Sequence, residues 1–515
     1  MSTYTDASLI YYPSGYKEDK LYSLKPTDGS GDLDFTRAST ATRVNEQGLI
    51  EEASVLGSEL VTNGDFATDT DWTKGGGWSI DTINGVAVAN NVSSFIALSQ
   101  NSVFVPGKRY LITYTILDYV SGNVAIFDGN VGVTTTRTSN GTYTQYFTPT
   151  SSSVRFISNG VVGTFKIDNV SVKEVITLNV PRIDYTGGGC AKLLLEGQRT
   201  NVIKQSQDYT TGDYILSNIT SININFATSP SGALNSQKVN FGTGASYVRS
   251  KESLASALSC SIFAKYVDYP YLQIMIGGDS EHYANFDVQN GTTGNVGTKS
   301  TASIEDYGNG WYRIIINSLS GTFGSAPRIY KIDNLLASWG TGGGAAGSCL
   351  LWGFQLELGS YSTSLINTTT TAVTRLADEV TLNNVYTNNL ITASGGTWFI
   401  HILNNIEKVR DTVGGLYLAQ TNAYNSSNGF RIGQTSATES RLKIVRYLGG
   451  VATTYQTTAD IIKIAISWNG TTWDLWENGI KVVSAEAFTF TALEYLASNL
   501  DIAYEIQSQE LYPTA

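Results

Sequence analysis

The sequence predicts an all-β protein made of several tandem antiparallel β-sandwiches. The chain of 515 residues contains 51 glycines and 30 tyrosines, and only 15% of its residues are charged, a composition typical of short strands joined by tight polar turns. No window longer than about two turns shows the apolar period of a helix. Because domains usually span roughly 100 to 200 residues, this length predicts about three or four domains, each with its own core.

Net charge, hydropathy and cysteine content indicate which kinds of partner the protein has and in which compartment it is made. The formal net charge is -11, whereas a nucleic-acid-binding face needs clustered Lys and Arg, so we expect no nucleic-acid partner. No run of about 18 apolar residues predicts a membrane span, and residues 1–10 lack the features of a signal peptide; we expect synthesis in a cytoplasm and no membrane insertion. The three cysteines, Cys190, Cys260 and Cys349, are too dispersed for a disulfide framework and are expected to be buried free thiols.

The first half of the chain divides at changes in its strand and turn pattern. Residues 1–56 are polar and turn-rich, and we expect no independent core there. Residues 57–176 have the size of one sandwich, and within them apolar residues alternate with Thr from Tyr110 to Ile116, the period of a half-buried strand. Residues 177–200 form a connector that is neither low-complexity nor linker-like, so we expect it to pack on a neighbour.

The second half holds two more predicted sandwiches. Residues 201–367 repeat the layout of 57–176, with an Asn/Asp-aromatic opening, a central aromatic-rich strand and a similar closing strand, which indicates a divergent internal repeat. In residues 368–515, three strands at 461–468, 472–477 and 480–483 are separated by Asn469-Gly470 and Asn478-Gly479. Asn-Gly favours type I′ hairpin turns, because both central residues need positive φ. These strands therefore form a meander.

Five segments resemble virion proteins of tailed bacteriophages of the tail-fibre, head-fibre or carbohydrate-binding structural type. They are Phe35–Glu51, Pro181–Asn201, Gly308–Arg313, Gln355–Ser360 and Thr374–Asp378. The unit 57–176 is similar to jelly-roll carbohydrate-binding modules, 201–367 to a second jelly roll, and the last unit to concanavalin A-like and laminin G-like sandwiches. In the family, the segment ending at Glu51 leads almost directly to the equivalent of Pro181, which makes 57–176 a predicted insertion.

The resemblance also implies a location and partners. It places the protein on the virion, with residues 1–56 associating with other virion proteins, host-surface glycans as ligands, and a homo-oligomer, preferably a trimer. Jelly-roll modules of this kind often hold a structural Ca²⁺ between a carboxylate near the first strand and another near the last, and by resemblance Asp65 and Asp168 take these positions. The alternative is that both are ordinary turn residues.

The sequence reveals no catalytic residues. The chain has only two histidines, His282 and His401, so it offers few residues for a Ser-His-Asp arrangement or a histidine metal site. His282 lies beside Asp279 and Glu281, which could hold a cation, although a solvated loop is the simpler interpretation. For glycoside hydrolysis the last unit offers Asp474 with Glu477, which point to opposite faces, and Asp501 with Glu505, about 13 Å apart along a strand and therefore too far apart.

Aromatic side chains are the remaining candidates for function. Sugar rings stack on Trp and Tyr, and their hydroxyls need polar partners, which this chain has in abundance. Trp311 and Trp352 lie in predicted strands and are expected in the core, whereas Trp72, Trp78 and Tyr119 lie in turn-rich segments and form the predicted carbohydrate-binding platform. The preferred function is a non-enzymatic glycan-binding virion protein. A purely structural fibre or decoration protein and a glycan depolymerase are the alternatives.

Overall fold

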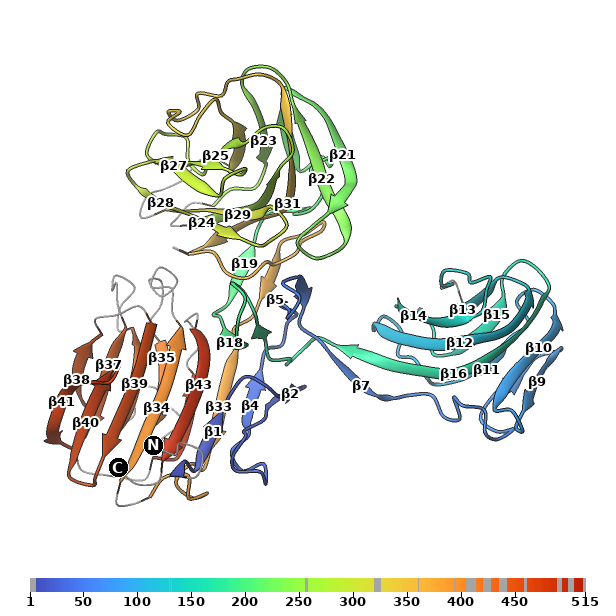
Figure 1. Cartoon of the computed structure of the whole chain (residues 1–515), viewed down its shortest axis with the longest axis horizontal. Coiled ribbons are helices and arrows are strands. Elements are labelled where there is room, and N and C mark those ends of the chain that lie inside the picture. The colour runs from blue at the N-terminus through green and yellow to red at the C-terminus, as the bar shows by residue number, and fades with distance from the viewer. Residues whose placement is uncertain are drawn as a thin grey trace. The chain divides into compact units, whose positions relative to one another are not determined.

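The computed structural model describes residues 6–128, 130, 132–254, 258–318, 326–359, 361–392, 395–403, 414–419, 428–434, 442–457, 461–488, 493–498 and 504–512. Within these ranges every named element is a β-strand and the sheets are antiparallel (Figure 1), which confirms the all-β class. The same ranges contain no helix with the length and hydropathy needed to cross a membrane. The chain divides into two compact units, one of residues 54–177 and one of residues 1–53 with 178–515.

The unit 54–177 is a two-sheet sandwich, called here the first jelly roll. One sheet has the order β14-β12-β16-β10-β9 with β7 paired to β16, and the other has the order β13-β15-β11-β8. The strands are β7 (Val55–Glu59), β8 (Thr73–Lys74), β9 (Trp78–Asp81), β10 (Val86–Val92), β11 (Leu98–Gln100), β12 (Tyr110–Ser121), β13 (Val124–Phe127), β14 (Gly141–Phe147), β15 (Val154–Ser158) and β16 (Gly163–Ile176).

Two features of this unit follow from its sequence. From Tyr110 to Ile116, β12 buries every second side chain, as its alternation predicts. Val55 pairs directly with Ile176, and directly paired residues lie only about 5 Å apart. The two ends of the unit are therefore adjacent.

Residues 201–367 form a second sandwich, called here the second jelly roll, with two six-stranded sheets. Their orders are β20-β23-β30-β25-β26-β27 and β21-β22-β31-β24-β29-β28. The strands are β20 (Tyr214–Ser217), β21 (Ile219–Thr228), β22 (Leu234–Phe241), β23 (Ser246–Ser250), β24 (Leu258–Tyr266), β25 (Tyr271–Met275), β26 (Tyr283–Asp287), β27 (Thr292–Val296), β28 (Ser300–Asp306), β29 (Trp311–Ser318), β30 (Arg328–Lys331) and β31 (Gly347–Leu358).

The two jelly rolls share most of their strand order, as the predicted internal repeat requires. The order β14-β12-β16-β10-β9 in the first corresponds to β29-β24-β31-β22-β21 in the second. Likewise β13-β15-β11-β8 corresponds to β25-β30-β23-β20. The second jelly roll differs by the additional strands β26, β27 and β28.

The C-terminal sandwich also takes strands from the start of the chain and from the connector. One sheet has the order β17-β18-β43-β34-β39-β40-β41 with β1 paired to β43, and the other has the order β2-β3-β4-β33-β42-β35-β36-β37-β38. The early strands are β1 (Leu9–Tyr11), β2 (Tyr16–Lys17), β3 (Lys20–Leu21), β4 (Leu33–Thr36), β17 (Ile183–Asp184) and β18 (Lys192–Leu195). The late strands are β33 (Glu379–Asn383), β34 (Gly396–Leu403), β35 (Gly414–Ala419), β36 (Asn428–Gln434), β37 (Lys443–Leu448), β38 (Val451–Gln456), β39 (Ile461–Trp468), β40 (Thr472–Glu477), β41 (Ile480–Ala487), β42 (Tyr495–Ser498) and β43 (Tyr504–Tyr512).

Two small ladders lie next to this sandwich in sequence. One joins β5 (Thr42–Val44) to β6 (Ile50–Glu52), and the other joins β19 (Arg199–Asn201) to β32 (Val373–Arg375). In the second ladder, the connector forms a sheet with the segment that follows the second jelly roll. The connector is thus structured at both of its ends.

The predicted meander is confirmed, but only one of its turns has the predicted form. Asn478 and Gly479 both have positive φ, at 50° and 84°, as a type I′ turn requires. At the other turn only Gly470 has positive φ. Three residues separate the strands there, and the Asn469 side chain accepts hydrogen bonds from the backbone N–H groups of Thr471 (3.2 Å) and Thr472 (3.0 Å).

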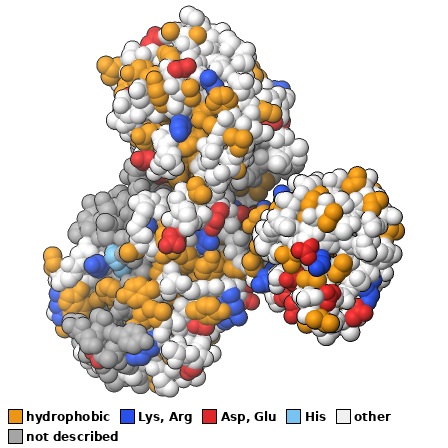
Figure 2. All heavy atoms as spheres, turned by 45° about the vertical axis from the view of Figure 1, so that its right-hand side comes forward, with side chains coloured by type: hydrophobic (Ala, Val, Ile, Leu, Met, Phe, Trp, Pro, Cys, Tyr) orange, Lys and Arg blue, Asp and Glu red, His pale blue; other side chains and the backbone are white. Residues whose placement is uncertain are grey.

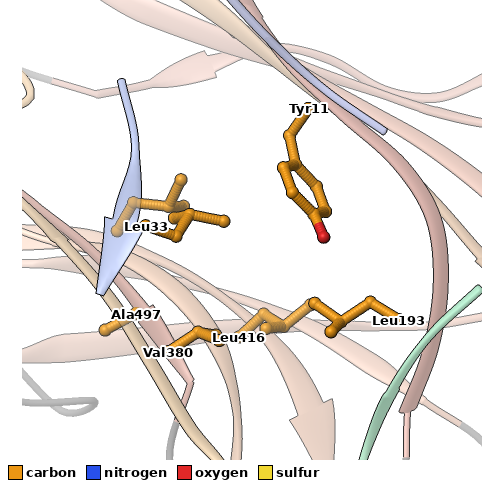
Figure 3. A pocket seen from close by; sticks show the side chains of 7 residues that line it. Tyr11, Leu33, Leu193, Val380, Leu416 and Ala497 are labelled. Carbon is orange, nitrogen blue, oxygen red and sulfur yellow. The ribbon is translucent and has the colours of Figure 1, made fainter. Parts of the chain in front are cut away.

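The core of the C-terminal sandwich shows why the early strands are needed. A small apolar cavity in it is lined by Tyr11, Leu33, Leu193, Val380, Leu416, Leu496 and Ala497 (Figure 3). Tyr11, Leu33 and Leu193 come from β1, β4 and β18, and all three are almost fully buried. The N-terminal segment therefore has no core of its own, as predicted, because it completes this one.

Candidate functional site

The predicted platform of the first jelly roll is not exposed, which corrects the expectation for its two tryptophans. Trp72 and Trp78 are only 5% and 6% exposed and belong to the hydrophobic core. The indole N–H of Trp72 donates to the carbonyl of Asn63 (3.0 Å), and that of Trp78 donates to the carbonyl of Ile96 (3.1 Å). Each ring is buried and each N–H is used to hold a loop, so neither offers a face to a sugar.

Tyr119, the third residue of the predicted platform, also makes structural contacts. Tyr119 packs against the same core, and its hydroxyl donates to the carbonyl of Gly122 at 2.7 Å. Trp311 and Trp352, in the second jelly roll, are buried as predicted.

The structure brings the predicted calcium ligands into neighbouring segments without assembling an acidic cluster. The N–H of Val170 donates to the carbonyl of Gly64 (2.8 Å), so the chain beside Asp65 runs close to the chain beside Asp168. Asp168 already accepts from the backbone (2.6 Å) and the side-chain amide (2.9 Å) of Asn169. In the described part of the chain, no three His, Cys, Asp or Glu side chains form a group that could hold a metal ion. Carbonyl groups and water would have to supply most ligands, and the calcium site stays a prediction.

The other candidate polar residues are engaged in structural contacts. His282 is buried rather than solvated, at 3% exposure, with Nδ1 2.7 Å from Oδ1 of Asp279, while Glu281 pairs with Lys299 (2.6 Å). Asp474 pairs with Lys481 at 2.9 Å, and Glu477 accepts from the hydroxyl of Tyr455 at 3.1 Å. Asp501 lies outside the described residues.

The cysteines follow the expectation in two cases out of three. Cys260 and Cys349 are buried free thiols, and burial raises the pKa of both. Cys190 is exposed, in contrast to the prediction. It directly follows three glycines with positive φ.

A set of aromatic and cationic side chains lies on one face of the second jelly roll. In β23 and β30, Val248 and Ile329 point into the core, so the residues on either side of each point outward. Tyr247 is directly opposite Tyr330, and Arg249 is directly opposite Arg328. These four residues are called here the tyrosine–arginine face. Charged side chains are sparse on the surface shown in Figure 2, which is mostly uncharged, so two adjacent arginines are a distinct local feature.

Strand register extends these four residues into two rows across the sheet. One row contains Ser217, Tyr247, Tyr330, Gln273 and Asn285, and the other contains Ile215, Arg249, Arg328, Met275 and Tyr283. The rings of Tyr247 and Tyr330 have centroids 4.8 Å apart, and the Arg328 guanidinium lies 6.0 Å from the Tyr247 centroid. Tyr330 is only 9% exposed, whereas Tyr247, Arg249 and Arg328 are half-buried. Tyr330 is therefore the most buried of the four residues.

The segment 333–340 closes the amide end of the first row. The side-chain amide of Asn285 donates to the carbonyls of Leu335 (3.0 Å) and Ala337 (2.8 Å), and the N–H of Gly340 donates to the Gln273 side-chain oxygen (3.0 Å). These bonds hold Trp339 against the cluster that contains Met275 and Tyr330. Trp339 therefore packs on the same outer face of the sheet as Tyr330.

Sequence reasoning missed this face, because its pattern emerges only from the pairing of two distant strands. The available signal was Tyr-x-Arg at 247–249 and Arg-x-Tyr at 328–330, two short segments with the same residue types at strand spacing. Neither segment is unusual alone. Antiparallel pairing makes them complementary.

The five family-like segments converge elsewhere, on a buried network of ions. Arg37 pairs with Asp378 (2.7 Å), Arg182 pairs with Asp378 and Glu196, and Arg375 pairs with Glu196. All five side chains are 2% exposed or less. Burial by itself would raise the pKa of the Asp378 carboxyl, but the charges of Arg182, Arg37 and Arg375 outweigh it and hold that pKa below its usual range. The pKa of Glu196 is lowered in the same way by Arg375 and Arg182.

Further hydrogen bonds link this network to the second jelly roll. Ser364 donates through its N–H (2.9 Å) and its hydroxyl (2.7 Å) to Glu196. Its neighbour Thr363 donates its N–H to Glu357 (3.0 Å) and accepts from Arg313 (2.7 Å). The network thus ties together one residue or more from each family-like segment. Every carboxylate in the network accepts hydrogen bonds from arginine or hydroxyl donors. This arrangement indicates a structural role for the network.

Comparison with known proteins finds likenesses among solved structures. No family model and no curated protein match the chain. Among solved structures, it is similar to the N-terminal CBM22-1-CBM22-2 tandem domain from Paenibacillus barcinonensis Xyn10C, at 12% sequence identity and a TM-score of 0.23, covering 60% of this chain and 98% of that chain. A likeness this distant carries no conclusion about ligand or activity. The chain is an all-β, multi-sandwich protein.

Proposed function

We propose that the chain is a non-enzymatic surface protein of a tailed-bacteriophage virion that binds host-surface glycans through the tyrosine–arginine face. The observation that carries the binding role is the paired array of Tyr247, Tyr330, Arg249 and Arg328 on one outer sheet face. The virion location is supported by the order of the five family-like segments in the sequence.

The face offers the two kinds of contact that a sugar needs. A pyranose ring presents C–H groups that pack on an aromatic ring, and Tyr247 is half-buried beside the ring of Tyr330. Arg249 lies in the next row, and its guanidinium group donates hydrogen bonds to sugar oxygens. Because the floor is a rigid sheet, little ordering accompanies binding.

A shallow site of this kind binds weakly by itself. Sugar hydroxyls exchange water for protein partners with little net gain, so we expect a Kd in the millimolar to micromolar range, about -4 to -8 kcal/mol. Several copies on one particle, in a homo-oligomer for which a trimer is our preferred state, would convert such sites into firm attachment through effective concentration.

A glycan array probed with the full chain, displayed on multivalent beads, tests the binding role. We expect Tyr247→Ala to abolish the signal while its circular dichroism stays unchanged. The matched control is Tyr146→Ala, because Tyr146 is 57% exposed with the Arg109 guanidinium 4.0 Å from its ring centroid but belongs to the other jelly roll. Equal binding by Tyr247→Ala and the native chain would show that this face is not the site.

The two alternatives have tests of their own. If the native chain binds no glycan even when displayed in many copies, a purely structural fibre or decoration protein becomes the better proposal. Release of reducing ends from host polysaccharide would instead reveal a depolymerase. Mass spectrometry of purified virions, separated into heads and tails, tests the virion location.

A further inference from the structure

We infer that the first jelly roll carries a second binding site, which docks on a neutral lipid surface. Three connections between its strands form this site, called here the apolar tip: residues 93–97, 119–123 and 158–163. Their exposed apolar side chains are Phe95 (50%), Ile96 (38%), Val120 (73%), Val161 (44%) and Val162 (52%). The inference does not depend on the proposed glycan site, which lies in the second jelly roll.

Hydrogen bonds join the three segments of the apolar tip to one another. The N–H of Phe95 donates to the carbonyl of Ser158 (3.2 Å), which links the first segment to the third. The N–H of Asn159 donates to the carbonyl of Asn123 (2.8 Å), which links the third segment to the second. The side chains of the tip are therefore carried by one connected structure.

Two glycines bring the valines of the tip together. A Cβ atom added to Gly122 would lie only 2.7 Å from the Cα atom of Gly163, so the two backbones are in direct contact. Val120 is two residues from the first of these glycines, and Val161 and Val162 directly precede the second. The three exposed valines thus lie close to a single point of the module.

The apolar tip lies at the opposite end of the module from its attachment. Strand β16 begins at Gly163, in the tip, and ends at Ile176, which pairs with Val55 where the chain enters and leaves the module (Figure 1). At about 3.3 Å per residue, the strand spans roughly 40 Å between these ends. The tip is therefore presented at the free end of an inserted domain.

The fold fixes Phe95 and Ile96 in an exposed conformation. Phe95 has a φ of 62°, which is costly for a residue with a bulky side chain. The carbonyl of Ile96 accepts a hydrogen bond from the indole of Trp78 (3.1 Å), which holds this segment on the core. Backbone strain of this kind persists only where the surrounding structure imposes it, and it is frequent at binding sites.

The polar groups of the tip favour a neutral, apolar partner. The three segments contain no charged residue, and the adjoining Asp118 pairs with Lys166 (2.7 Å). The N–H of Gly160 donates within the tip, to the hydroxyl of Ser94 (2.9 Å). Charges and unpaired backbone groups are costly in hydrocarbon, so these features suit shallow entry into lipid. The net charge of -11 opposes binding to an anionic surface.

The size of the tip argues against a second protein chain as the partner. A stable protein interface uses about 20–30 residues on each side, whereas the tip offers five exposed apolar side chains. Lipid acyl chains need no matching shape, and each side chain that leaves water contributes in proportion to its apolar area. Shallow contact of this kind needs no membrane-spanning segment. Several copies on one particle would strengthen it.

Flotation of the full chain with phosphatidylcholine vesicles tests the site. We expect the native chain to bind, and Val161→Ser combined with Val162→Ser to lower the partition coefficient by roughly tenfold or more, because two aliphatic side chains are lost from the contact. The matched control is Ile83→Ser, which should bind like the native chain. Ile83 is 94% exposed and lies in the turn between β9 and β10, at the opposite end of β10 from the tip. Thermal melts confirm that each variant is folded.

A fluorescent label measures insertion directly. Val162→Cys is made together with Cys190→Ser, because Cys190 is exposed whereas Cys260 and Cys349 are buried. An environment-sensitive fluorophore on the new thiol should shift its emission to shorter wavelength when vesicles are added. The same label introduced through Ile83→Cys should not shift.

Every outcome bears on the lipid site. Failure of the native chain to bind vesicles, or equal binding by the Val161→Ser/Val162→Ser variant, would overturn it. Binding that requires phosphatidylglycerol in the vesicles would also overturn it, because an electrostatic contact elsewhere would then be responsible. If the double substitution instead abolishes self-association in sedimentation velocity, the tip is an interface between copies. Glycan binding by the same variant should be unchanged, so the two proposals succeed or fail separately.

Discussion

Replacing Asp378 with asparagine should destabilise the unit formed by residues 1–53 and 178–515 more than any surface change. The carboxylate of Asp378 is the counter-charge of both Arg37 and Arg182, and none of the three side chains is exposed. Asparagine keeps one oxygen acceptor and a similar shape but removes the charge. Both guanidinium groups then lose a charge partner inside the protein.

The structure sets the expected magnitude. Removing one member of a buried ion pair costs about 3–5 kcal/mol, because the remaining charge stays desolvated. In domains of 150 to 250 residues each kcal/mol lowers Tm by roughly 2–4 °C, so Asp378→Asn should lower the transition of this unit by roughly 6 to 20 °C. The unit contains two sandwiches, and the transition that contains the network is the one to follow.

Differential scanning calorimetry of the full chain measures this shift, and the transition of the first jelly roll serves as an internal reference. The control variant is Glu281→Gln, which removes a surface pair with Lys299 whose side chains are 42% and 46% exposed. Exposed pairs contribute little, so we expect its Tm within about 2 °C of the native value. If Asp378→Asn shifts Tm no more than this control, the network does not hold the unit together and the reasoning is wrong.

Four further predictions test other parts of the fold. The pKa values of Asp378 and Glu196 are lowered in the folded state. The stability that these two carboxylates contribute is therefore present above their unfolded pKa of about 4 and is lost as pH falls below it. Calorimetry from pH 7 to pH 3 should show the Tm of this unit falling below about pH 4, and an unchanged Tm would contradict this prediction. The hydroxyl of Tyr11 is buried in an apolar cavity (Figure 3) and has no hydrogen-bond partner among the described residues, and burial raises its pKa. Tyr11→Phe should therefore be neutral or stabilise by about 1 kcal/mol in denaturant titrations; a clear loss of stability would mean that the hydroxyl has a partner. Chelation by EGTA should lower the transition of the first jelly roll if Asp65 and Asp168 hold calcium, and the double alanine variant should abolish that response; no response in the native protein refutes the site. Deleting residues 54–177 should leave a cooperatively folded remainder, because Val55 and Ile176 are paired neighbours; a non-cooperative melt would show that the two units depend on each other.

Local patterns in the sequence predicted the parts of the fold that depend on local physics. The alternation from Tyr110 to Ile116 and the Asn478-Gly479 turn each follow from neighbouring residues, and both were predicted correctly. The Asn469-Gly470 turn was not, because one extra residue between the strands changes the turn type. The side chain of Asn469 stabilises this turn by accepting hydrogen bonds from the backbone N–H groups of Thr471 and Thr472.

Long-range pairing explains what the sequence could not predict. Strand β1 pairs with β43, so Leu9 lies opposite Leu511, and no local pattern relates residues so far apart. The exposure of a tryptophan is equally hard to predict from the sequence, because an indole in a turn-rich segment can lie on the surface or in the core. The N–H groups of Trp72 and Trp78 find backbone carbonyls, and this makes burial of both rings favourable.

The five family-like segments and the tyrosine–arginine face lie in different parts of the structure. Residues of the five family-like segments meet in the buried network around Asp378 and Glu196, where their charges hold the N-terminal segment, the connector and the second jelly roll to the C-terminal sandwich. None of the four residues of the tyrosine–arginine face belongs to those segments. Residues in a junction are constrained by several partners at once, whereas residues on an outer sheet face have fewer structural partners. A scaffold of this design can keep its junction fixed while the sequence of its outer sheet faces changes.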